Sequence, residues 1–220
     1  MKYKCLVLDH DDTVVNSTAT IHYPCFEQYL VDKKPHLVGK FDLPTFFEKN
    51  FDPGVLEFFS GDVGLTEQEM EEEEVYWRDF VNNHIPTAYA GMKEILERFL
   101  AEGGIIAVAS HSLSHYIERD YRENGLPMPS MIYGWELPKH QRKPAPYPLL
   151  DLMERYGLSP SEMLMVDDLK PGFDMARAAG VPFAAAGWAH NIEKISSFMR
   201  RHCDFYLPSV EALSELIFDA

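Results

Sequence analysis

The sequence has few cysteines, and their spacing excludes the usual uses of cysteine in groups. The three cysteines, Cys5, Cys25 and Cys203, lie far apart and lack CxxC spacing. This pattern argues against a disulfide framework or a zinc site and is typical of a protein from a reducing compartment. We therefore expect a cytoplasmic protein.

Long apolar runs are also missing. No run approaches the roughly 18 apolar residues that a membrane-spanning helix needs. The apolar stretch before Asp9 is too short for a signal peptide. The apolar content of 46% and the charged content of 25% are those of a globular protein, and 220 residues suffice for one large domain or two modest ones. No membrane partner is expected.

Positive charge is scarce, with 20 Lys and Arg against 35 Asp and Glu and a net charge of −15 at pH 7. Such a surface disfavours nucleic acid and does not attract anionic membranes. A phosphorylated substrate would meet an unfavourable long-range field. Any site for it must therefore be built locally from a metal ion, lysine side chains and backbone N–H groups.

Short apolar runs alternate with helical patterns through most of the chain. Apolar residues recur at helical spacing in segments such as Met92–Leu100. Gly104, Gly157 and Gly180 stand where helices are expected to stop. This alternation predicts an α/β fold, a Rossmann-like doubly wound parallel sheet with its active edge at the carboxyl ends of the strands. The predicted strands are Lys4–Leu8, Ile105–Ala109, Met131–Tyr133, Met163–Val166 and Pro182–Ala186.

The segment 17–86 breaks the alternation. It contains no convincing strand and is rich in aromatic residues and helix formers. A capping box at Thr66 opens a helix through the acidic run Glu67–Glu74, which we interpret as a solvated helix face rather than a metal site. We predict an all-helical cap, residues 17–86, inserted into a Rossmann-like core formed by residues 1–16 and 87–220.

Polar side chains gather at the predicted carboxyl ends of the strands. In a doubly wound sheet these ends meet at one crevice. Carboxylates from two strands make a hard-oxygen site suited to Mg²⁺, and buried charges of this kind need a compensating cation. A hydroxyl and an ammonium beside them suit a phosphoryl group. The residues are Asp9 and Asp11 after the first strand, Ser110 after the second, Lys143 before the fourth, and Asp167 and Asp168 at the end of the fourth.

This order of motifs resembles the haloacid dehalogenase superfamily. The family's first motif is a strand followed by Asp-x-Asp-x-Thr, and its second is a strand that ends in Ser or Thr. The third is a Lys, often followed by Pro, and the fourth is a strand that ends in an acidic pair. The insertion resembles the helical cap of the branch that contains phosphoglycolate phosphatases and β-phosphoglucomutase-like proteins. The matching residues are Asp9, Asp11 and Thr13, then Ser110, then Lys143 and Pro144, then Asp167 and Asp168.

The resemblance implies catalytic and metal-binding roles. Asp9 would attack phosphorus and form an aspartyl-phosphate, and Asp11 would be the general acid and then the general base. Asp168 would hold Mg²⁺ together with Asp9. The backbone carbonyl of Asp11 would be another ligand, and Asp167 either a further ligand or a support for the ligands.

The resemblance also implies how the substrate is held. Ser110 and Lys143 would bind the phosphoryl oxygens. His111, which follows Ser110 at the same crevice, is a candidate to contact the substrate or to support these residues. In this branch the cap closes over the leaving group and sets specificity. Candidate contacts in the cap are Lys40, His22 and Tyr23.

The implied activity is Mg²⁺-dependent hydrolysis of a small phosphorylated metabolite. Asp11 favours phosphate chemistry, because dehalogenases and phosphonate-cleaving members lack an Asp at that position. Two alternatives stay open: a phosphomutase of the same family that acts on a sugar phosphate, and a receiver-like or non-catalytic phosphoacceptor protein. Receivers also have a doubly wound sheet, but their phosphoacceptor Asp ends the third strand, where this sequence has Gly134 and Trp135.

Three positions depart from the family pattern. Asp12 stands where Gly is common, which adds negative charge and affects the turn. His10 stands where an apolar residue is usual, and we interpret it as an imidazole that is structural or that supports the residues of the site. Asp174 comes late after Asp168, and it either supports the metal site or begins the helix Asp174–Ala179.

Overall fold

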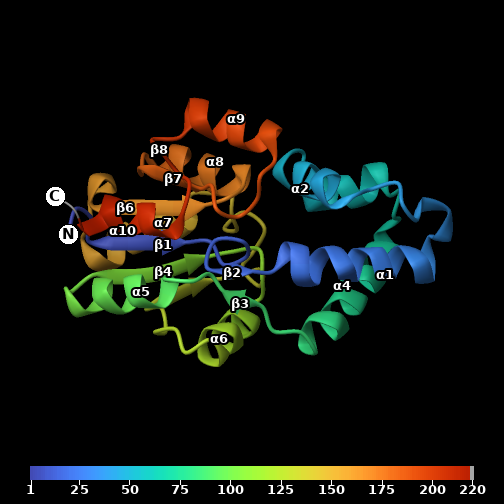
Figure 1. Ribbon diagram of the computed structural model, residues 1–220, viewed down its shortest axis with the longest axis horizontal. Helices are drawn as coiled ribbons and strands as arrows, with labels where there is room; N and C mark the ends of the chain where they lie inside the picture. The colour runs from blue at the N-terminus through green and yellow to red at the C-terminus, as the bar shows by residue number, and fades with distance from the viewer. Residues whose placement is uncertain (219–220) are drawn as a thin grey trace. The chain divides into compact units, whose positions relative to one another are not determined.

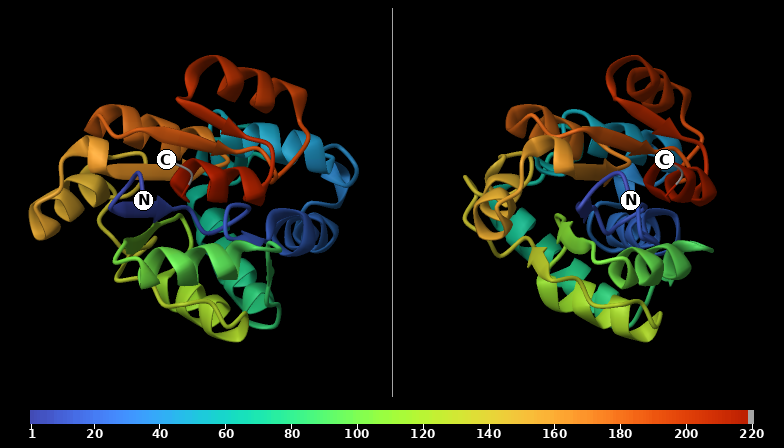
Figure 2. Two further views of the ribbon diagram at one scale, coloured as in Figure 1. Left: turned by 60° about the vertical axis from the view of Figure 1, so that its left-hand side comes forward. Right: turned by 90° about the vertical axis from the view of Figure 1, so that its left-hand side faces the viewer.

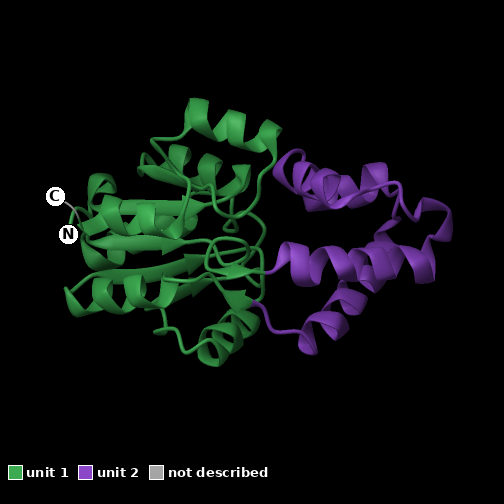
Figure 3. Ribbon diagram, in the orientation of Figure 1, with its two compact units in different colours: residues 1–16, 87–220 green, residues 17–86 purple. Residues whose placement is uncertain are grey.

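The structure is a computed structural model that describes residues 1–218. The chain divides into two compact units (Figure 3). Unit 1 comprises Met1–Asn16 and Thr87–Ala220, and unit 2 comprises Ser17–Pro86. Across the described residues, no helix combines the length and the apolar character that crossing a bilayer requires.

Unit 1 alternates strands and helices along the chain. Gly157 and Gly180 end two of its helices in the left-handed conformation, as predicted. The elements of unit 1 are β1 (Cys5–Leu8), β2 (Val15–Asn16), β3 (Thr87–Ala88), α5 (Met92–Ala101), β4 (Ile105–Ala109), α6 (Ser114–Glu123), β5 (Met131–Tyr133), α7 (Tyr147–Tyr156), η4 (Pro160–Glu162), β6 (Met163–Asp167), α8 (Lys170–Ala179), β7 (Phe183–Ala186), α9 (Glu193–His202), β8 (Phe205–Leu207) and α10 (Val210–Phe218).

Within residues 1–218, six parallel strands form one sheet in the order β5-β4-β1-β6-β7-β8. Strand β1 lies between β4 and β6, where Cys5 pairs with Ile105 on one side and Met163 on the other (Figures 1 and 2). The predicted doubly wound parallel sheet is therefore confirmed. Numbered within the sheet, the order is that of the Rossmann class, whereas receiver domains have the order 2-1-3-4-5. The strand order therefore argues against the receiver alternative.

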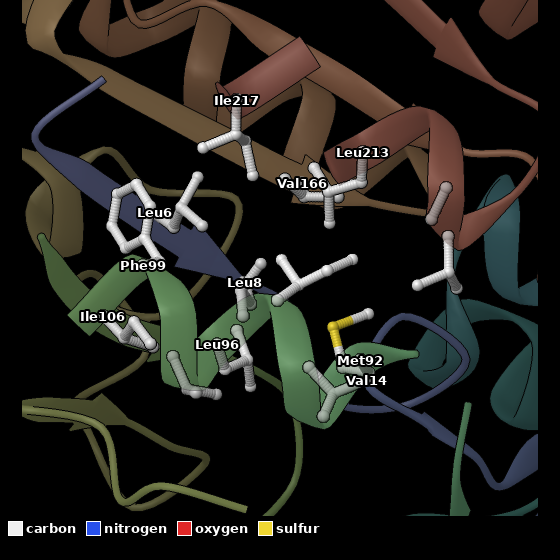
Figure 4. Close-up of a cluster of buried hydrophobic side chains, with 14 of the residues drawn as sticks. Leu6, Leu8, Val14, Met92, Leu96, Phe99, Ile106, Val166, Leu213 and Ile217 are labelled. Carbon is white, nitrogen blue, oxygen red and sulfur yellow. The ribbon is translucent and has the colours of Figure 1, made fainter. Parts of the chain in front are cut away.

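Alternate residues of each strand point to opposite faces of the sheet. Leu6 and Leu8 of β1 pack with side chains of α5 and α10 on one face (Figure 4). Full burial of a Leu or Phe side chain contributes roughly 1.5–3 kcal/mol relative to exposure, so this cluster stabilises the end of β1 that leads into Asp9. Its buried side chains include Leu6, Leu8, Met92, Leu96, Phe99, Ile106, Val166, Leu213 and Ile217.

Helix α8 packs against β6 and β7 and approaches the end of β6 closely. A Cβ added at Gly172 would come within 2.1 Å of Asp167 Oδ2. Because a side chain of any size would meet the carboxylate, glycine is required here. Gly172 therefore sets how close α8 lies to Asp167.

Strands β2 and β3 form a short antiparallel pair in unit 1. Val15 pairs with Ala88 and Asn16 pairs with Thr87. Just beyond this pair, the Tyr89 N–H donates to the Val14 carbonyl at 3.0 Å. The chain leaves unit 1 after Asn16 and returns at Thr87, so both ends of unit 2 are fixed to neighbouring positions.

The structure corrects two expectations about local structure. Gly103, with φ 87°, takes the left-handed conformation after α5, rather than Gly104. Gly104 is needed because an added Cβ would lie 2.3 Å from the Phe99 ring. Helix α8 begins at Lys170, not at Asp174. Asp174 lies within the helix, where its half-exposed carboxylate is 3.4 Å from Lys170 Nζ, and it therefore neither begins the helix nor joins the carboxylates at the strand ends.

Unit 2 is built from helices and turns. The ring of Phe26 lies 5.1 Å from that of Phe46 and 5.6 Å from that of Phe58, in an aromatic core. The predicted capping box of Thr66 and Glu69 opens α4. The elements of unit 2 are η1 (Thr18–His22), α1 (Tyr23–Lys33), η2 (Pro35–Leu37), α2 (Leu43–Phe51), α3 (Val55–Glu57), η3 (Phe58–Asp62) and α4 (Glu67–Asn82).

Candidate active site

The ammonium of Lys143 joins the ends of β1 and β6. Its Nζ lies 2.9 Å from Asp9 Oδ1 and 2.7 Å from Asp167 Oδ2, and all three residues are buried. Burial alone would lower the pKa of Lys143, but Asp167 and Asp9 outweigh this and hold the pKa above its usual value. Lys143 is therefore a charged group that offsets part of the carboxylate charge.

The neighbouring carboxylates of Asp167 and Asp168 have different surroundings. Asp167 accepts from Lys143 through Oδ2 and from the Leu169 N–H through Oδ1, at 2.7 Å each. Asp168 Oδ2 is buried and accepts no hydrogen bond from the described residues. The His190 ring lies beside it, with Nε2 at 3.8 Å. Asp168 thus presents the carboxylate oxygen that a further cation could use.

These carboxylates fit a divalent metal ion. One oxygen from each of Asp9, Asp167 and Asp168 lies within 4.8 Å of the others, and hard oxygen donors of this kind suit Mg²⁺ or Ca²⁺. Burial raises the pKa of Asp167 to about 7, and burial with nearby carboxylates, Asp12 among them, raises the pKa of Asp168 well above its usual value. A bound cation would relieve this accumulation of negative charge.

Asp12 contributes to the negative charge beside Asp168 and to the shape of the loop after β1. It is buried and has φ 56°, in the left-handed region where glycine is favoured. Its N–H donates to the Val15 carbonyl at 2.7 Å, which closes the loop after β1. Asp is among the few residues other than glycine that tolerate this conformation, so the loop keeps its shape despite the missing glycine.

Asp11 and Ser110 are linked through Ser112. The Ser112 hydroxyl donates to Asp11 Oδ2 at 2.6 Å, and the Ser112 N–H donates to Ser110 Oγ at 3.1 Å. Since Ser110 Oγ already accepts one bond, its own O–H can donate to another acceptor, such as a phosphoryl oxygen. The structure thus brings together the ends of β1 and β4.

His111 contacts the segment that carries Lys143. Its Nε2 lies 2.7 Å from the Lys143 carbonyl oxygen, and because a carbonyl only accepts, Nε2 carries the proton. Burial, followed by the nearby Lys143, lowers the pKa of His111 to about 4. At neutral pH the ring is therefore uncharged, and it braces the backbone of Lys143.

The His10 side chain contacts α6. Its Nε2 lies 3.0 Å from Asp120 Oδ2, and both side chains are buried. Arg119 also binds Asp120, with Nε donating to Oδ1 at 2.8 Å. These contacts agree with the interpretation of His10 as a structural imidazole, and they tie the loop after Asp9 to α6.

The sequence of the chain matches the model of a known family. The model of the family described as haloacid dehalogenase-like hydrolase matches residues 6–186. The chain belongs to this haloacid dehalogenase-like hydrolase family. The match runs from β1 to the end of β7, and it therefore includes every element of unit 1 that carries a candidate site residue.

Known proteins and solved structures are similar to this chain. A phosphoglycolate phosphatase from Thiobacillus denitrificans is 29% identical over 59% of this chain and 57% of its own length. The chain thus matches little more than half of that relative. Among solved structures, a Bacteroides fragilis protein described as a haloacid dehalogenase-like hydrolase has 22% identity, a TM-score of 0.78, and coverage of 96% of this chain and 100% of its own. A hydrolase of this family from Deinococcus radiodurans with bound phosphate and sodium has 20% identity and a TM-score of 0.73, and covers 99% of this chain and 96% of its own.

The cap candidates suggested by the family resemblance lie in unit 2. Lys40 is exposed in the turn after η2. The His22 Nδ1 accepts from the indole N–H of Trp77 at 3.1 Å, and the Tyr23 hydroxyl donates to the Phe41 carbonyl at 3.1 Å. His22 and Tyr23 therefore hold the helices of unit 2 together, while the Lys40 side chain faces solvent.

Four residues near the family's motifs were not identified from the sequence: Ser112, Asp120, Gly172 and His190. Ser112 and His190 follow predicted strands, so their position at the carboxyl ends was a usable signal. Asp120 gave no such signal, because it lies within a helix and 110 residues from its partner His10. Gly172 becomes informative only when the approach of α8 to Asp167 is known.

Proposed function

We propose that this protein is a Mg²⁺-dependent phosphatase that hydrolyses a small phosphorylated metabolite through an aspartyl-phosphate on Asp9. The observation that carries the proposal is the contact of Lys143 with Asp9 beside the converging oxygens of Asp167 and Asp168. A nucleophilic carboxylate, an ammonium for the phosphoryl group and a cation site are then adjacent. Family membership supports the same chemistry.

In the first step, a carboxylate oxygen of Asp9 forms a bond to phosphorus while the bond from phosphorus to the leaving oxygen breaks. Asp11 donates its proton to the leaving oxygen. In the second step, water attacks phosphorus, Asp11 takes the water's proton, and the bond from Asp9 to phosphorus breaks. Inorganic phosphate leaves, and both carboxyl groups return to their initial states.

Ser110 and Lys143 would bind the phosphoryl oxygens. The O–H of Ser110 is available for this because Ser110 Oγ accepts from the Ser112 N–H. Asp9 and Asp168 would hold Mg²⁺, with the Asp11 backbone carbonyl and Asp167 as further candidates. When bound, the metal ion supplies positive charge that lets a phosphate dianion approach several carboxylates.

The substrate class rests on analogy with relatives that are named phosphoglycolate phosphatase. We propose that unit 2 is the cap that sets specificity and that Lys40 contacts the substrate. The cysteines are free thiols, and burial raises the pKa of Cys5 to about 12. Cysteines that form no disulfide support the proposed location in the reducing cytoplasm.

The test is release of inorganic phosphate from 4-nitrophenyl phosphate and from a panel of phosphorylated metabolites, with Mg²⁺ or with chelator, for the wild type and for Asp9→Asn. We expect Mg²⁺-dependent release that Asp9→Asn abolishes. We also expect a ³²P-labelled substrate to label the wild-type protein covalently but not the Asp9→Asn variant. Undiminished release by Asp9→Asn would refute the nucleophile assignment. Isomerisation of a sugar phosphate without net release would favour the phosphomutase.

A further inference from the structure

The hydrogen bond between Ser112 and Asp11 connects two strand ends. The Ser112 hydroxyl donates to Asp11 Oδ2 at 2.6 Å, a short distance typical of an O–H bound to a carboxylate. Ser112 is 6% exposed, so little water competes for this bond. Asp11 comes from the loop after β1 and Ser112 from the segment after β4, 101 residues apart.

The backbone of Ser112 is fixed on both sides. Its N–H donates to Ser110 Oγ at 3.1 Å, and its carbonyl accepts from the Trp135 N–H at 2.9 Å. The Ser110 N–H in turn donates to the Tyr133 carbonyl at 3.0 Å. The hydroxyl of Ser112 is therefore anchored to β4 and β5 rather than to a free loop, and it gives Asp11 a rigid partner.

We propose that Ser112 is a positioning residue for Asp11. By holding Oδ2, the hydroxyl fixes the plane of the carboxyl group so that Oδ1 meets the leaving-group oxygen. This inference rests on the proposed phosphatase function, in which Asp11 donates a proton to that oxygen. Without the hydroxyl, the half-buried carboxyl group loses this contact to Oδ2, and the donating geometry is populated for less of the time.

The same segment then serves both ends of the reacting bond. Ser110 is placed for the phosphoryl group, which is common to every phosphate ester. Ser112 acts through Asp11 on the leaving group, which differs between esters. The loss of activity on removal of Ser112 should therefore depend on the leaving group, whereas the loss on removal of Ser110 should depend on it much less. 4-Nitrophenolate departs as a stable anion, whereas the alkoxide of an alkyl phosphate needs a proton as it departs.

The experiment measures kcat/KM with Mg²⁺ for 4-nitrophenyl phosphate and for alkyl phosphates such as phosphoglycolate and glycerol phosphate. This parameter reports the steps up to departure of the leaving group. For Ser112→Ala we expect a loss of about 10- to 100-fold on the alkyl phosphate and less than about threefold on the aryl phosphate. Ser112→Thr, which keeps a hydroxyl, should recover much of the alkyl activity.

Two further variants serve as controls for Ser112→Ala. Asp11→Asn should show the same preference for the aryl substrate with larger losses, since it removes the proton itself. Ser110→Ala should lose a large factor on both substrates, since it removes the proposed contact to the phosphoryl group; it also removes the acceptor of the Ser112 N–H, so any additional loss on the alkyl phosphate should be smaller than that of Ser112→Ala. Equal losses on both substrates for Ser112→Ala, or no loss on either, would overturn the role of Ser112 while leaving the phosphatase proposal intact. Absence of turnover by the wild type on every ester would overturn both proposals.

Discussion

The imidazole of His10 lies 3.0 Å from the carboxylate of Asp120, with both groups shielded from solvent. This contact joins the residue next to Asp9 to the middle of α6. Asp120 also receives Arg119, so the carboxylate binds two basic side chains. The residue that follows the candidate nucleophile is therefore held by α6.

Removing either partner of this pair should destabilise unit 1. His10→Ala removes the contact to the buried Asp120 Oδ2, while Arg119 still binds Oδ1, and Asp120→Ala removes the contact to the buried His10 Nε2. We expect each variant to lower the free energy of unfolding by about 1–3 kcal/mol. The double variant should lose less than the sum, because both single variants remove the same contact. Denaturant unfolding of all four proteins gives the coupling, and strictly additive losses would show that the contact contributes nothing.

Gly172→Ala should be much more damaging than an ordinary change of glycine to alanine. The new Cβ would lie 2.1 Å from Asp167 Oδ2, so either α8 or the carboxylate has to move. We expect a loss of several kcal/mol, on the order of 2–4, together with weaker stabilisation by Mg²⁺. Thermal unfolding with and without Mg²⁺ measures both effects.

Gly61→Ala is the matched control for this variant, because Gly61 has no atom within 4 Å of an added Cβ and no positive φ. We expect it to unfold within about 1 kcal/mol of the wild type. Equal stability of the two variants would mean that α8 moves away from Asp167 at little cost.

Asp12→Asn should stabilise the metal-free protein. Asp12 is one of the carboxylates that raise the pKa of Asp168, after the larger effect of burial, and Asn removes that charge while keeping the size of the side chain. Asp12→Gly should add a further gain, since glycine adopts φ 56° without strain. We expect gains of roughly 0.5–2 kcal/mol in chelator. Lower unfolding temperatures for both variants would show that Asp12 contributes bonds that outweigh its charge.

We expect Glu73 to make the stability of unit 2 depend on pH. Burial, followed by the charge of Glu74, raises its pKa from 4.5 to about 7, and His22 opposes this. The folded protein thus holds the proton more tightly than the unfolded chain, so this group lowers stability progressively as the pH rises from about 4.5 to about 7. Glu73→Gln should raise the unfolding temperature at pH 8 and change it little at pH 4.

The exposed neighbour Glu71 supplies the control, since Glu71→Gln changes the same charge on the same helix. We expect the Glu73→Gln gain at pH 8 to be roughly 1–3 kcal/mol and the Glu71→Gln change to stay within about 0.5 kcal/mol. Identical responses of the two variants at both pH values would assign the effect to the overall charge of α4.

The sheet could be read from the sequence because its central strands are continuous apolar runs. Strands β1, β4 and β6 are buried on both faces, which leaves an apolar run in each. Strand β8 was not predicted, although β5, which was, has the same length of three residues, an edge position and the same partial burial. The pair of β2 and β3, with two residues each, is too short to show any period.

The sequence predicted which residues of the candidate site lie at the ends of the strands, but not the contacts that their side chains make. Lys143 was expected near the carboxylates, and the structure places its ammonium between Asp9 and Asp167. Two features depend on side-chain directions that no local sequence pattern encodes. One is that Asp168 Oδ2 accepts no hydrogen bond from the described residues, and the other is that the Ser112 hydroxyl reaches Asp11. The roles of these residues in catalysis stay predictions until the variants are measured.

The pairing of Asn16 with Thr87 has a consequence for how this protein can change. The two residues that flank unit 2 are paired with each other, as are the residues that flank the loop of a hairpin. The length and sequence of unit 2 can therefore change without changing the register of β2 and β3. A whole replacement module, or a tight turn, could join the same two strands with no shift in the sheet. Under the proposed function, in which unit 2 sets specificity, exchange of unit 2 would change the choice of substrate and leave the residues at the strand ends in place.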